Sequence, residues 1–243
     1  MKIFTTAIIK GGTGKTTTAA ALAQAAAADK KKVLAIDLDP QGNLSFYLAA
    51  DKSKAGAVEL LQGTPAAETI QTTPQGIDII AARGDLAAEE TTTGSTRRLQ
   101  EALQPIKKLY DIIIIDTPPQ MGELVFNGLQ AAEGIIIPVE ADSGSLAGIY
   151  NLAELIEATK RTNKGLKVAG VIVTRYDNRA KINQYLKDTI KEKSEAEGFP
   201  YLMEIRQGIA VKEALQLQQA LYKYAPKSKP AADYRKLLAM LTK

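Results

Sequence analysis

Runs of apolar, mostly β-branched residues recur along the chain and are separated by segments with helical periodicity. Several of these runs are continuously apolar, which is typical of strands that are buried on both faces of a sheet. The predicted strands are Lys2–Ile9, Lys32–Asp37, Ile77–Ala81, Asp111–Asp116, Gly134–Val139, Lys167–Thr174 and Tyr201–Ile205.

The segments between these runs have the spacing of helices that pack one face on a core. The predicted helices are Lys15–Ala28, Ser95–Lys107, Gly122–Ala132, Leu146–Thr162, Ala180–Glu197, Val211–Ala220 and Ala231–Leu241. Alternation of strands and helices predicts an α/β fold with a doubly wound, mostly parallel sheet flanked by helices. A ligand is then expected at the carboxyl ends of the strands. Because no repeat and no Ser/Gly linker occurs, we expect residues 1–243 to form a single domain.

Composition narrows the chemistry that such a fold can carry. The chain has no cysteine and no histidine, which excludes disulfides, Cys-ligated iron–sulfur clusters and thiol or imidazole catalysis. No apolar stretch reaches about 18 residues, and the first strand begins at Lys2, so we expect a cytoplasmic protein without membrane span or signal peptide. The net charge of +4 fits a nucleic-acid partner as well as it fits an ordinary basic enzyme.

A glycine-rich loop joins the first predicted strand to the first predicted helix. Backbone N–H groups of such a loop can surround phosphate oxygens, and the helix N-terminus adds a favourable dipole. Lys15 is expected to reach the terminal phosphates, and the hydroxyl of Thr16 is expected to hold Mg²⁺. The nucleotide-binding residues predicted in this loop are Lys10, Gly11, Gly12, Thr13, Gly14, Lys15, Thr16 and Thr17.

This loop departs from the usual G-x-x-x-x-G-K-[ST] pattern at its start. Ile9 takes the place of the first glycine, and Lys10 adds a second lysine. A lysine at this position cannot easily fold back onto the phosphates of its own subunit. Lys10 is therefore either a solvated lysine at the loop mouth or a catalytic cation that acts on the nucleotide of a partner subunit. The surrounding K-G-G-T-G-K-T-T sequence favours the second interpretation.

Acidic residues follow two of the predicted strands. Asp37 and Asp39 lie two residues apart, so their side chains point to the same side of an extended chain. One would help to hold Mg²⁺ through water and the other would orient the attacking water, unless the segment is an ordinary turn. Asp116 ends an isoleucine-rich strand of the Walker B form and is expected near the Mg²⁺. The following Thr117-Pro118-Pro119 predicts a rigid loop that senses the terminal phosphate.

The second half of the chain offers further polar candidates. Arg175 and Tyr176 follow a predicted strand and form either an adenine-edge loop or only a turn. Basic residues with interleaved tyrosines gather in residues 180–243, which predicts either a DNA-binding face or a solvated basic surface.

Together these motifs resemble the ParA/Soj family of chromosome- and plasmid-partitioning ATPases, within the group that includes MinD and the nitrogenase iron protein. The resemblance covers essentially the whole chain. Besides the phosphate loop it rests on Asp37–Asn43, Asp116–Pro119, Asn127–Ala132, Ile137–Glu140, Thr174–Asp177, Glu213-Ala214 and Tyr224–Lys229. It implies a P-loop NTPase fold with ATP at Gly11–Thr17. It also implies Mg²⁺ on Thr16, with the Asp37 and Asp116 carboxylates acting through water, and Asp39 positioning the water that attacks.

The resemblance further implies an ATP-dependent homodimer in which each Lys10 reaches the partner's nucleotide. It also implies slow hydrolysis that a ParB-like partner stimulates. It further implies nonspecific binding to double-stranded DNA and a nucleoid-associated location. The DNA contacts that it implies are Lys191, Lys193, Lys223, Lys227, Lys229 and Arg235.

Some positions depart from the family pattern. Ile205–Ala210 replaces the usual I-P-R-N-x-R, with Arg206 in place of the proline and Ala210 in place of an arginine. The resemblance therefore does not predict which residues form the wall of the adenine pocket.

One alternative function is a MinD-like ATPase at a membrane, for which the terminal helix has little apolar bulk. Another is an ATPase that positions a protein cluster.

Overall fold

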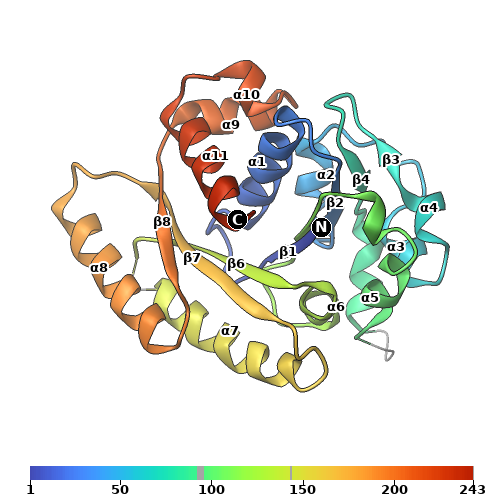
Figure 1. Cartoon of the computed structure of the whole chain (residues 1–243), viewed down its shortest axis with the longest axis horizontal. Coiled ribbons are helices and arrows are strands. Elements are labelled where there is room, and N and C mark those ends of the chain that lie inside the picture. Colours follow the sequence, from blue (N-terminus) through green and yellow to red (C-terminus); the bar gives the residue numbers. More distant parts are fainter. Residues whose placement is uncertain (92–95, 143, 243) are drawn as a thin grey trace.

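The computed structural model describes residues 1–91, 96–142 and 144–242. Eight strands in this part of the chain form one sheet: β1 (Lys2–Thr6), β2 (Val33–Asp37), β3 (Gln71–Thr72), β4 (Asp78–Ile80), β5 (Ile112–Asp116), β6 (Gly134–Glu140), β7 (Lys167–Tyr176) and β8 (Tyr201–Arg206). Their order in the sheet is β3-β4-β2-β5-β1-β6-β7-β8 (Figure 1). The edge strand β3 is antiparallel to β4, and all other neighbours are parallel. The predicted fold class is confirmed.

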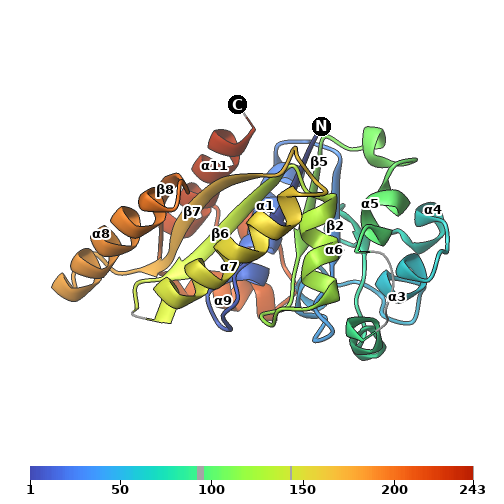
Figure 2. The same cartoon turned by 90° about the horizontal axis from the view of Figure 1, so that it is seen from below.

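Helices cover both faces of the sheet (Figure 2). One face carries α1 (Lys15–Ala28), α2 (Asn43–Tyr47), α9 (Ile209–Gln216), α10 (Leu221–Tyr224) and α11 (Lys229–Leu241). The other carries α3 (Ala57–Leu61), α4 (Ala66–Thr69), the 3-10 helix η1 (Gly84–Glu90), α5 (Arg98–Leu103), α6 (Glu123–Ala131), α7 (Gly144–Lys160) and α8 (Lys181–Ala196). A short 3-10 helix, η2 (Lys107–Leu109), leads into β5. No helix among the described residues is long and apolar enough to cross a membrane.

The core follows from the alternation of side chains along the central strands. Ile112 and Ile114 of β5 pack with α1 and α11, whereas Ile113 and Ile115 pack with α3, α5 and α6 on the opposite face. A strand that is apolar at every position is thus buried on both faces. Helix α1 is rich in alanine, and these small side chains allow it to lie between the sheet and α11. This packing fixes the N-terminus of α1 at the carboxyl edge of the sheet.

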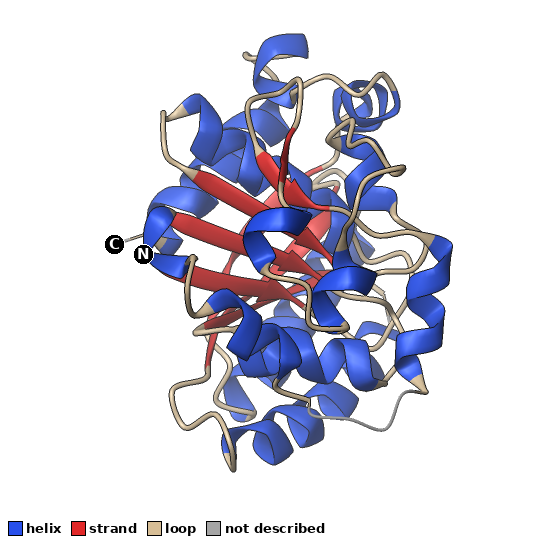
Figure 3. Cartoon of the chain, turned by 90° about the vertical axis from the view of Figure 1, so that its right-hand side faces the viewer, coloured by secondary structure: helices blue, strands red, loops and turns tan. Residues whose placement is uncertain are grey.

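All seven predicted strands are present, but some boundaries differ. The first strand ends at Thr6 rather than Ile9, because the chain leaves the sheet to form the glycine-rich loop. The arrows in Figure 3 run away from the edge at which both chain termini lie. Loops that follow the parallel strands therefore gather at one edge. The sequence did not predict the two-residue strand β3 or the short helices α2, α3, α4 and η1.

Two predicted helices need correction. The helix predicted from Ser95 to Lys107 reduces to α5, and Ser95 lies outside the described residues. The helix predicted from Val211 to Ala220 is α9, which ends at Gln216 because Gln218 adopts a left-handed φ of 54°. The chain then starts the separate helix α10.

Candidate functional site

The glycine-rich loop closes around the side chain of its own lysine. Gly12 and Gly14 have φ values of 80° and 91°, a left-handed conformation that glycine adopts without a Cβ clash. The Lys15 Nζ donates hydrogen bonds to the carbonyl oxygens of Ile8, at 3.3 Å, and Lys10, at 2.8 Å. Burial lowers the pKa of Lys15, whereas the charges of Asp116 and Asp39 act in the opposite direction. The ammonium of Lys15 is thus held within the loop by two backbone carbonyl oxygens.

The carboxyl end of β7 holds this loop in place. The Thr174 hydroxyl donates to the carbonyl oxygen of Thr13, at 2.7 Å, and the Arg175 Nη2 donates to that of Gly12, at 2.5 Å. The Arg175 guanidinium also pairs with Glu140 at the end of β6. Arg175 is therefore at the site, as predicted for a nucleotide-binding residue. The supporting roles of Thr174 and Glu140 were missed, because nothing local in the sequence indicates these long-range contacts.

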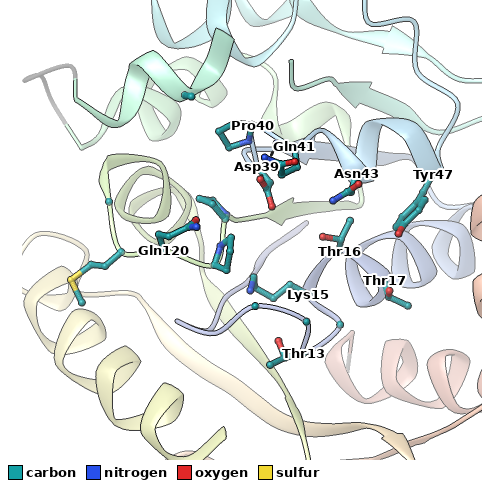
Figure 4. A pocket seen from close by; sticks show the side chains of 18 of the residues that line it. Thr13, Lys15, Thr16, Thr17, Asp39, Pro40, Gln41, Asn43, Tyr47 and Gln120 are labelled. Atoms are coloured by element: carbon teal, nitrogen blue, oxygen red, sulfur yellow. Dashed lines mark hydrogen bonds between the residues drawn. The ribbon is translucent and has the colours of Figure 1, made fainter. Parts of the chain in front are cut away.

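Two adjoining cavities open beside the loop. The larger has a volume of about 710 Å³ and is lined by Gly11–Thr17, Asp39–Gln41 and the Pro118–Gly122 segment, among others (Figure 4). The smaller, of about 490 Å³, lies between the loop and α9 and shares Gly14, Thr17, Tyr47 and Arg175 with the first. Together they offer space on both sides of the loop, in the range of volumes that small-molecule sites occupy.

The three predicted acidic residues lie in different environments. Asp39 lines the larger cavity, and its Oδ1 accepts a hydrogen bond from the Gln41 amide at 3.0 Å. Asp37 is fully buried behind it and is held by the amide and hydroxyl of Ser45, at 2.8 and 2.7 Å. Burial raises the pKa of Asp37 to about 6 despite these hydrogen bonds. Asp37 therefore supports the site from behind the cavity wall.

Asp116 is fully buried next to the glycine-rich loop. Its Oδ1 accepts a hydrogen bond from the Thr6 hydroxyl at 3.0 Å, whereas its Oδ2 has no hydrogen-bond partner in the described part of the chain. Burial and the charge of Asp37 raise the pKa of Asp116 to about 8, although the hydroxyls of Thr16 and Thr6 and the charge of Lys15 oppose this shift. A buried carboxylate oxygen without a partner is costly unless a cation or a water molecule reaches it.

These groups fit a Mg²⁺ ion that is bound largely through water. The Thr16 hydroxyl and the Asp39 carboxylate face the same space (Figure 4), and the free Oδ2 of Asp116 lies behind it. Within the described residues, no cluster of three or more acidic side chains is close enough to hold a metal directly. Mg²⁺ prefers oxygen ligands and usually keeps several waters, with substrate phosphates completing its shell. The residues present therefore match a metal that arrives with a nucleotide.

Lys10 points away from both cavities. Its Nζ lies 2.5 Å from each carboxylate oxygen of Asp142 and 3.4 Å from the Ser145 hydroxyl. Its ammonium therefore makes an ion pair within its own subunit. Sequence reasoning missed Asp142, which lies 132 positions away in the chain.

Tyr176 lies on the other face of β7 from the loop. It packs in the layer of α7 and α8, with the Lys187 Nζ 5.9 Å from the centroid of its ring, and it lines neither cavity. Successive residues of a strand point to opposite faces, which explains why Arg175 reaches the site and Tyr176 does not. We do not retain Tyr176 among the nucleotide-binding residues.

All six predicted DNA-contact residues are exposed, but they lie on two layers. Lys191 and Lys193 belong to α8, whereas Lys223, Lys227, Lys229 and Arg235 lie on or between α10 and α11. The two groups flank the edge strand β8 from opposite faces of the sheet (Figure 1). The segment 180–243 is therefore divided between the two faces, and its basic residues do not form one continuous helical layer.

Known proteins share this architecture. Residues 1–168 match the family described as AAA domain. The chain is 35% identical over 230 residues to the chromosome-partitioning ATPase Soj of Thermus thermophilus, covering 94% of this chain and 90% of that protein. It is 32% identical over 234 residues to the chromosome partitioning protein ParA of Myxococcus xanthus, covering 93% and 82%.

A solved structure extends the comparison to the nucleotide. The septum site-determining protein MinD of Pyrococcus horikoshii, complexed with Mg-ADP, superposes with a TM-score of 0.80 at 25% identity, covering 98% of this chain and 94% of that one. The predictions of an ATPase and of ATP and Mg²⁺ as its cofactors are confirmed by these relationships. The chain belongs to the ParA/Soj family of P-loop ATPases.

Proposed function

We propose that this ATPase is a dimerising switch for DNA segregation, active on DNA in its ATP-bound form. The observation that carries the proposal is the contrast between two lysines. Lys15 lies inside the phosphate loop, whereas Lys10 starts the same loop and points away from both cavities. A second lysine that cannot serve its own site supports a role at the site of a partner subunit. The chromosome-partitioning names of the relatives support DNA as the cargo.

In the proposed nucleotide complex, the phosphates of ATP lie against Gly11–Thr17. The Lys15 ammonium exchanges the two carbonyl oxygens that it now contacts for phosphate oxygens. Mg²⁺, when bound, neutralises phosphate charge, and the Thr16 hydroxyl and the free oxygen of Asp116 are the groups that hold it and its waters. Asp39 lines the cavity from the opposite side, where its carboxylate orients the attacking water.

The base of the nucleotide is proposed to occupy the smaller cavity. Its wall includes the segment that departs from the family pattern. There the Arg206 guanidinium makes a two-pronged ion pair with Asp233 of α11, at 2.8 and 2.6 Å. This pair fixes the long side chain of Arg206 against α11, so the wall remains ordered without the usual proline.

The carboxyl edge of the sheet supports closure of two subunits face to face. Exposed apolar side chains follow the ends of β5, β6, β7 and β8 there, and apolar side chains exposed beside a polar site are typical of an interaction surface. These side chains are Met121, Tyr150, Ile182, Tyr185 and Ile209. Closure over these side chains brings each Lys10 towards the nucleotide of the other subunit.

The proposed dimer binds double-stranded DNA without sequence preference through its exposed lysines and arginine. Lysine and arginine side chains contact the phosphates of the DNA backbone, and added salt weakens these contacts. A ParB-like partner then stimulates hydrolysis and releases the dimer. This cycle would place the protein at the nucleoid.

A MinD-like role in positioning is the second candidate, since the structure of MinD is similar to this one. The membrane version is disfavoured, because Leu237, Leu238 and Leu241 of α11 are buried against α1 and the sheet. Positioning of a protein cluster on the nucleoid keeps the same ATP and DNA chemistry.

The test is DNA binding by the purified chain with ATP, with ADP and without nucleotide, at two salt concentrations. We expect salt-sensitive binding with ATP only, and loss of that binding in Lys10→Ala although ATP still binds. Lys108→Ala, which changes an exposed lysine of η2 that lines neither cavity, is the control. A chain that binds ATP but binds no DNA in any state contradicts the segregation role and directs the next assay to liposomes and protein partners.

A further inference from the structure

The ion pair of Lys10 joins the start of the glycine-rich loop to the start of α7. Asp142 lies between β6 and α7, and both of its carboxylate oxygens are 2.5 Å from the Lys10 Nζ. Its Oδ1 also accepts a hydrogen bond from the Ser145 amide at 2.8 Å, so the carboxylate is fixed at the start of α7. The Lys10 ammonium, the Ser145 hydrogen bonds and the charge of Lys10 hold the pKa of Asp142 below its usual range.

The backbone around this pair is shaped to admit the lysine. A Cβ added at Gly144 would lie 3.2 Å from the Lys10 Nζ and 3.4 Å from its Cε. Contacts this close would require the end of the Lys10 side chain to shift by a few tenths of an ångström. The glycine at this position therefore leaves room for Lys10 to lie across the first turn of α7.

The same stretch of chain also pairs with a cation that contacts the loop, Arg175 of β7. Glu140, two residues before Asp142, pairs with Arg175, which in turn donates to the carbonyl oxygen of Gly12. The end of β6 thus supplies one carboxylate that anchors the loop and another that holds its first lysine. Arg175 lies beside the cavities, whereas Lys10 is directed away from them.

We propose that Asp142 is an intramolecular restraint that withholds Lys10 from nucleotide until a second subunit arrives. The inference rests on the proposed function, because it assigns Lys10 its target in the partner subunit. On closure, the ammonium exchanges one carboxylate for the phosphate oxygens of the partner's ATP. No covalent bond changes in this exchange. The ion pair is partly exposed, with 25% of the Lys10 and 41% of the Asp142 side chain accessible, so it is weak enough to be replaced.

Asp142 therefore sets the ATP concentration at which dimers form. With the restraint present, the phosphates must compete with a fixed carboxylate for Lys10. Without it, the ammonium is free before closure and the dimer forms more readily. Asp142→Asn isolates the charge, because asparagine also accepts the hydrogen bond at a helix N-terminus and preserves the start of α7.

The first experiment measures the restraint in the nucleotide-free chain. The rate at which an acetylating reagent labels each lysine is followed by mass spectrometry in the wild-type chain and in Asp142→Asn. We expect labelling of Lys10 to rise about threefold, the factor that corresponds to loss of an exposed ion pair, and labelling of Lys236 on α11 to stay constant. An unchanged rate at Lys10 overturns the proposal whether or not the chain dimerises.

The second experiment measures dimerisation by light scattering during an ATP titration. Asp142→Asn is expected to reach half-maximal dimer at about one third of the wild-type ATP concentration. Glu157→Gln, which removes the carboxylate of another α7 ion pair far from the loop, is the matched control and should behave as wild type. A variant that needs more ATP than the wild type overturns the restraint, since Asp142 would then support the dimer. A wild-type chain that never dimerises refutes the proposed function instead, and the labelling rates still decide whether Asp142 holds Lys10.

Discussion

Asp39 is the residue with the most direct access to the place where phosphate chemistry would occur. Its carboxylate lines the larger cavity opposite the phosphate loop, and the Gln41 amide fixes one of its oxygens (Figure 4). We expect Asp39→Ala to lower ATP turnover about 100-fold or more while ATP binding persists, because the attacking water loses its orienting group. Phosphate release and binding of a fluorescent ATP analogue measure the two effects.

Asp39→Asn serves as the companion variant, because it keeps the shape of the side chain and its oxygen for the Gln41 amide. Loss of turnover in both variants assigns the effect to the carboxylate charge. Normal turnover in Asp39→Ala would remove Asp39 from the proposed catalytic residues.

The buried acids Asp37 and Asp116 give the nucleotide-free chain a pH-dependent stability. Burial raises their pKa values to about 6 and about 8, above the ordinary 3.8. The folded state therefore binds more protons than the unfolded state. The free energy of unfolding is expected to fall as the pH rises from about 4 to about 8. Urea unfolding in EDTA at a series of pH values measures this slope.

Asp116→Asn should remove most of the slope above about pH 7, because Asp37, with a pKa of about 6, is largely ionised there. A wild-type chain whose stability is constant from pH 5 to pH 8 would contradict the assignment. Binding of Mg-nucleotide is expected to strengthen over the same range, because the ionised Asp116 attracts the cation.

At the residue level, the sequence predicted which side chains would line the cavities better than it predicted their partners. Lys15, Thr16, Asp39 and Arg175 all reach the cavities as predicted. Asp142, the partner of Lys10, lies 132 positions from it in the chain. Thr174, whose hydroxyl donates to the carbonyl oxygen of Thr13, lies 161 positions from Thr13. Such contacts depend on which loops the sheet order brings together, and no local pattern encodes that order.

At the level of elements, long periodic segments were predicted well and short ones were not. The helices α6, α8 and α11 have enough residues for their one-sided apolar periodicity to be distinctive, whereas α1 was marked by its run of alanines after the glycine-rich loop and the buried strands by their continuous apolar runs. Helices such as α2 and α3, with five residues each, span little more than one turn. The left-handed residue that ends α9 is a glutamine, so neither glycine nor proline marked the break.

The turn that carries Asp39 depends on one glycine. Gly42 has a φ of 63°, and a Cβ there would lie 2.8 Å from the carbonyl oxygen of Ala82. We expect Gly42→Ala to lower the free energy of unfolding by about 2 kcal/mol, because it adds a contact with rigid backbone to the cost of a left-handed alanine. Nucleotide binding should weaken too, since α2 starts here and its Ser45 holds Asp37.

Gly63→Ala is the matched control for that measurement. Gly63 also has a positive φ, of 100°, but an added Cβ would meet nothing within 4 Å. Urea unfolding of both variants separates the conformational cost from the contact. Equal losses in the two variants would show that the approach of Ala82 contributes nothing.

At the scale of the whole molecule, the sheet divides the basic residues that the sequence grouped together. Lys191 and Lys193 on α8 stand among the acidic residues Glu192, Glu195 and Glu197, which reduces the local positive charge. Lys223, Lys227 and Lys229 are exposed and lie along the short stretch that runs from α10 to the first residue of α11. A phosphate backbone is attracted by net charge rather than by single lysines. We therefore expect the stretch between α10 and α11 to make the main DNA contact.

Charge removal on each layer tests this assignment. The triple variant Lys223→Gln, Lys227→Gln, Lys229→Gln should weaken ATP-dependent DNA binding. It should also reduce the slope of log K against log salt by about 3, since each lost phosphate contact removes about 0.9. The double variant Lys191→Gln, Lys193→Gln should change the slope by less than one unit. If the double variant has the larger effect, DNA lies against the α7–α8 layer, and the dimer must present that layer to the nucleoid. If neither changes the slope, both basic groups are solvated surface, and the nucleotide switch acts on a partner other than DNA.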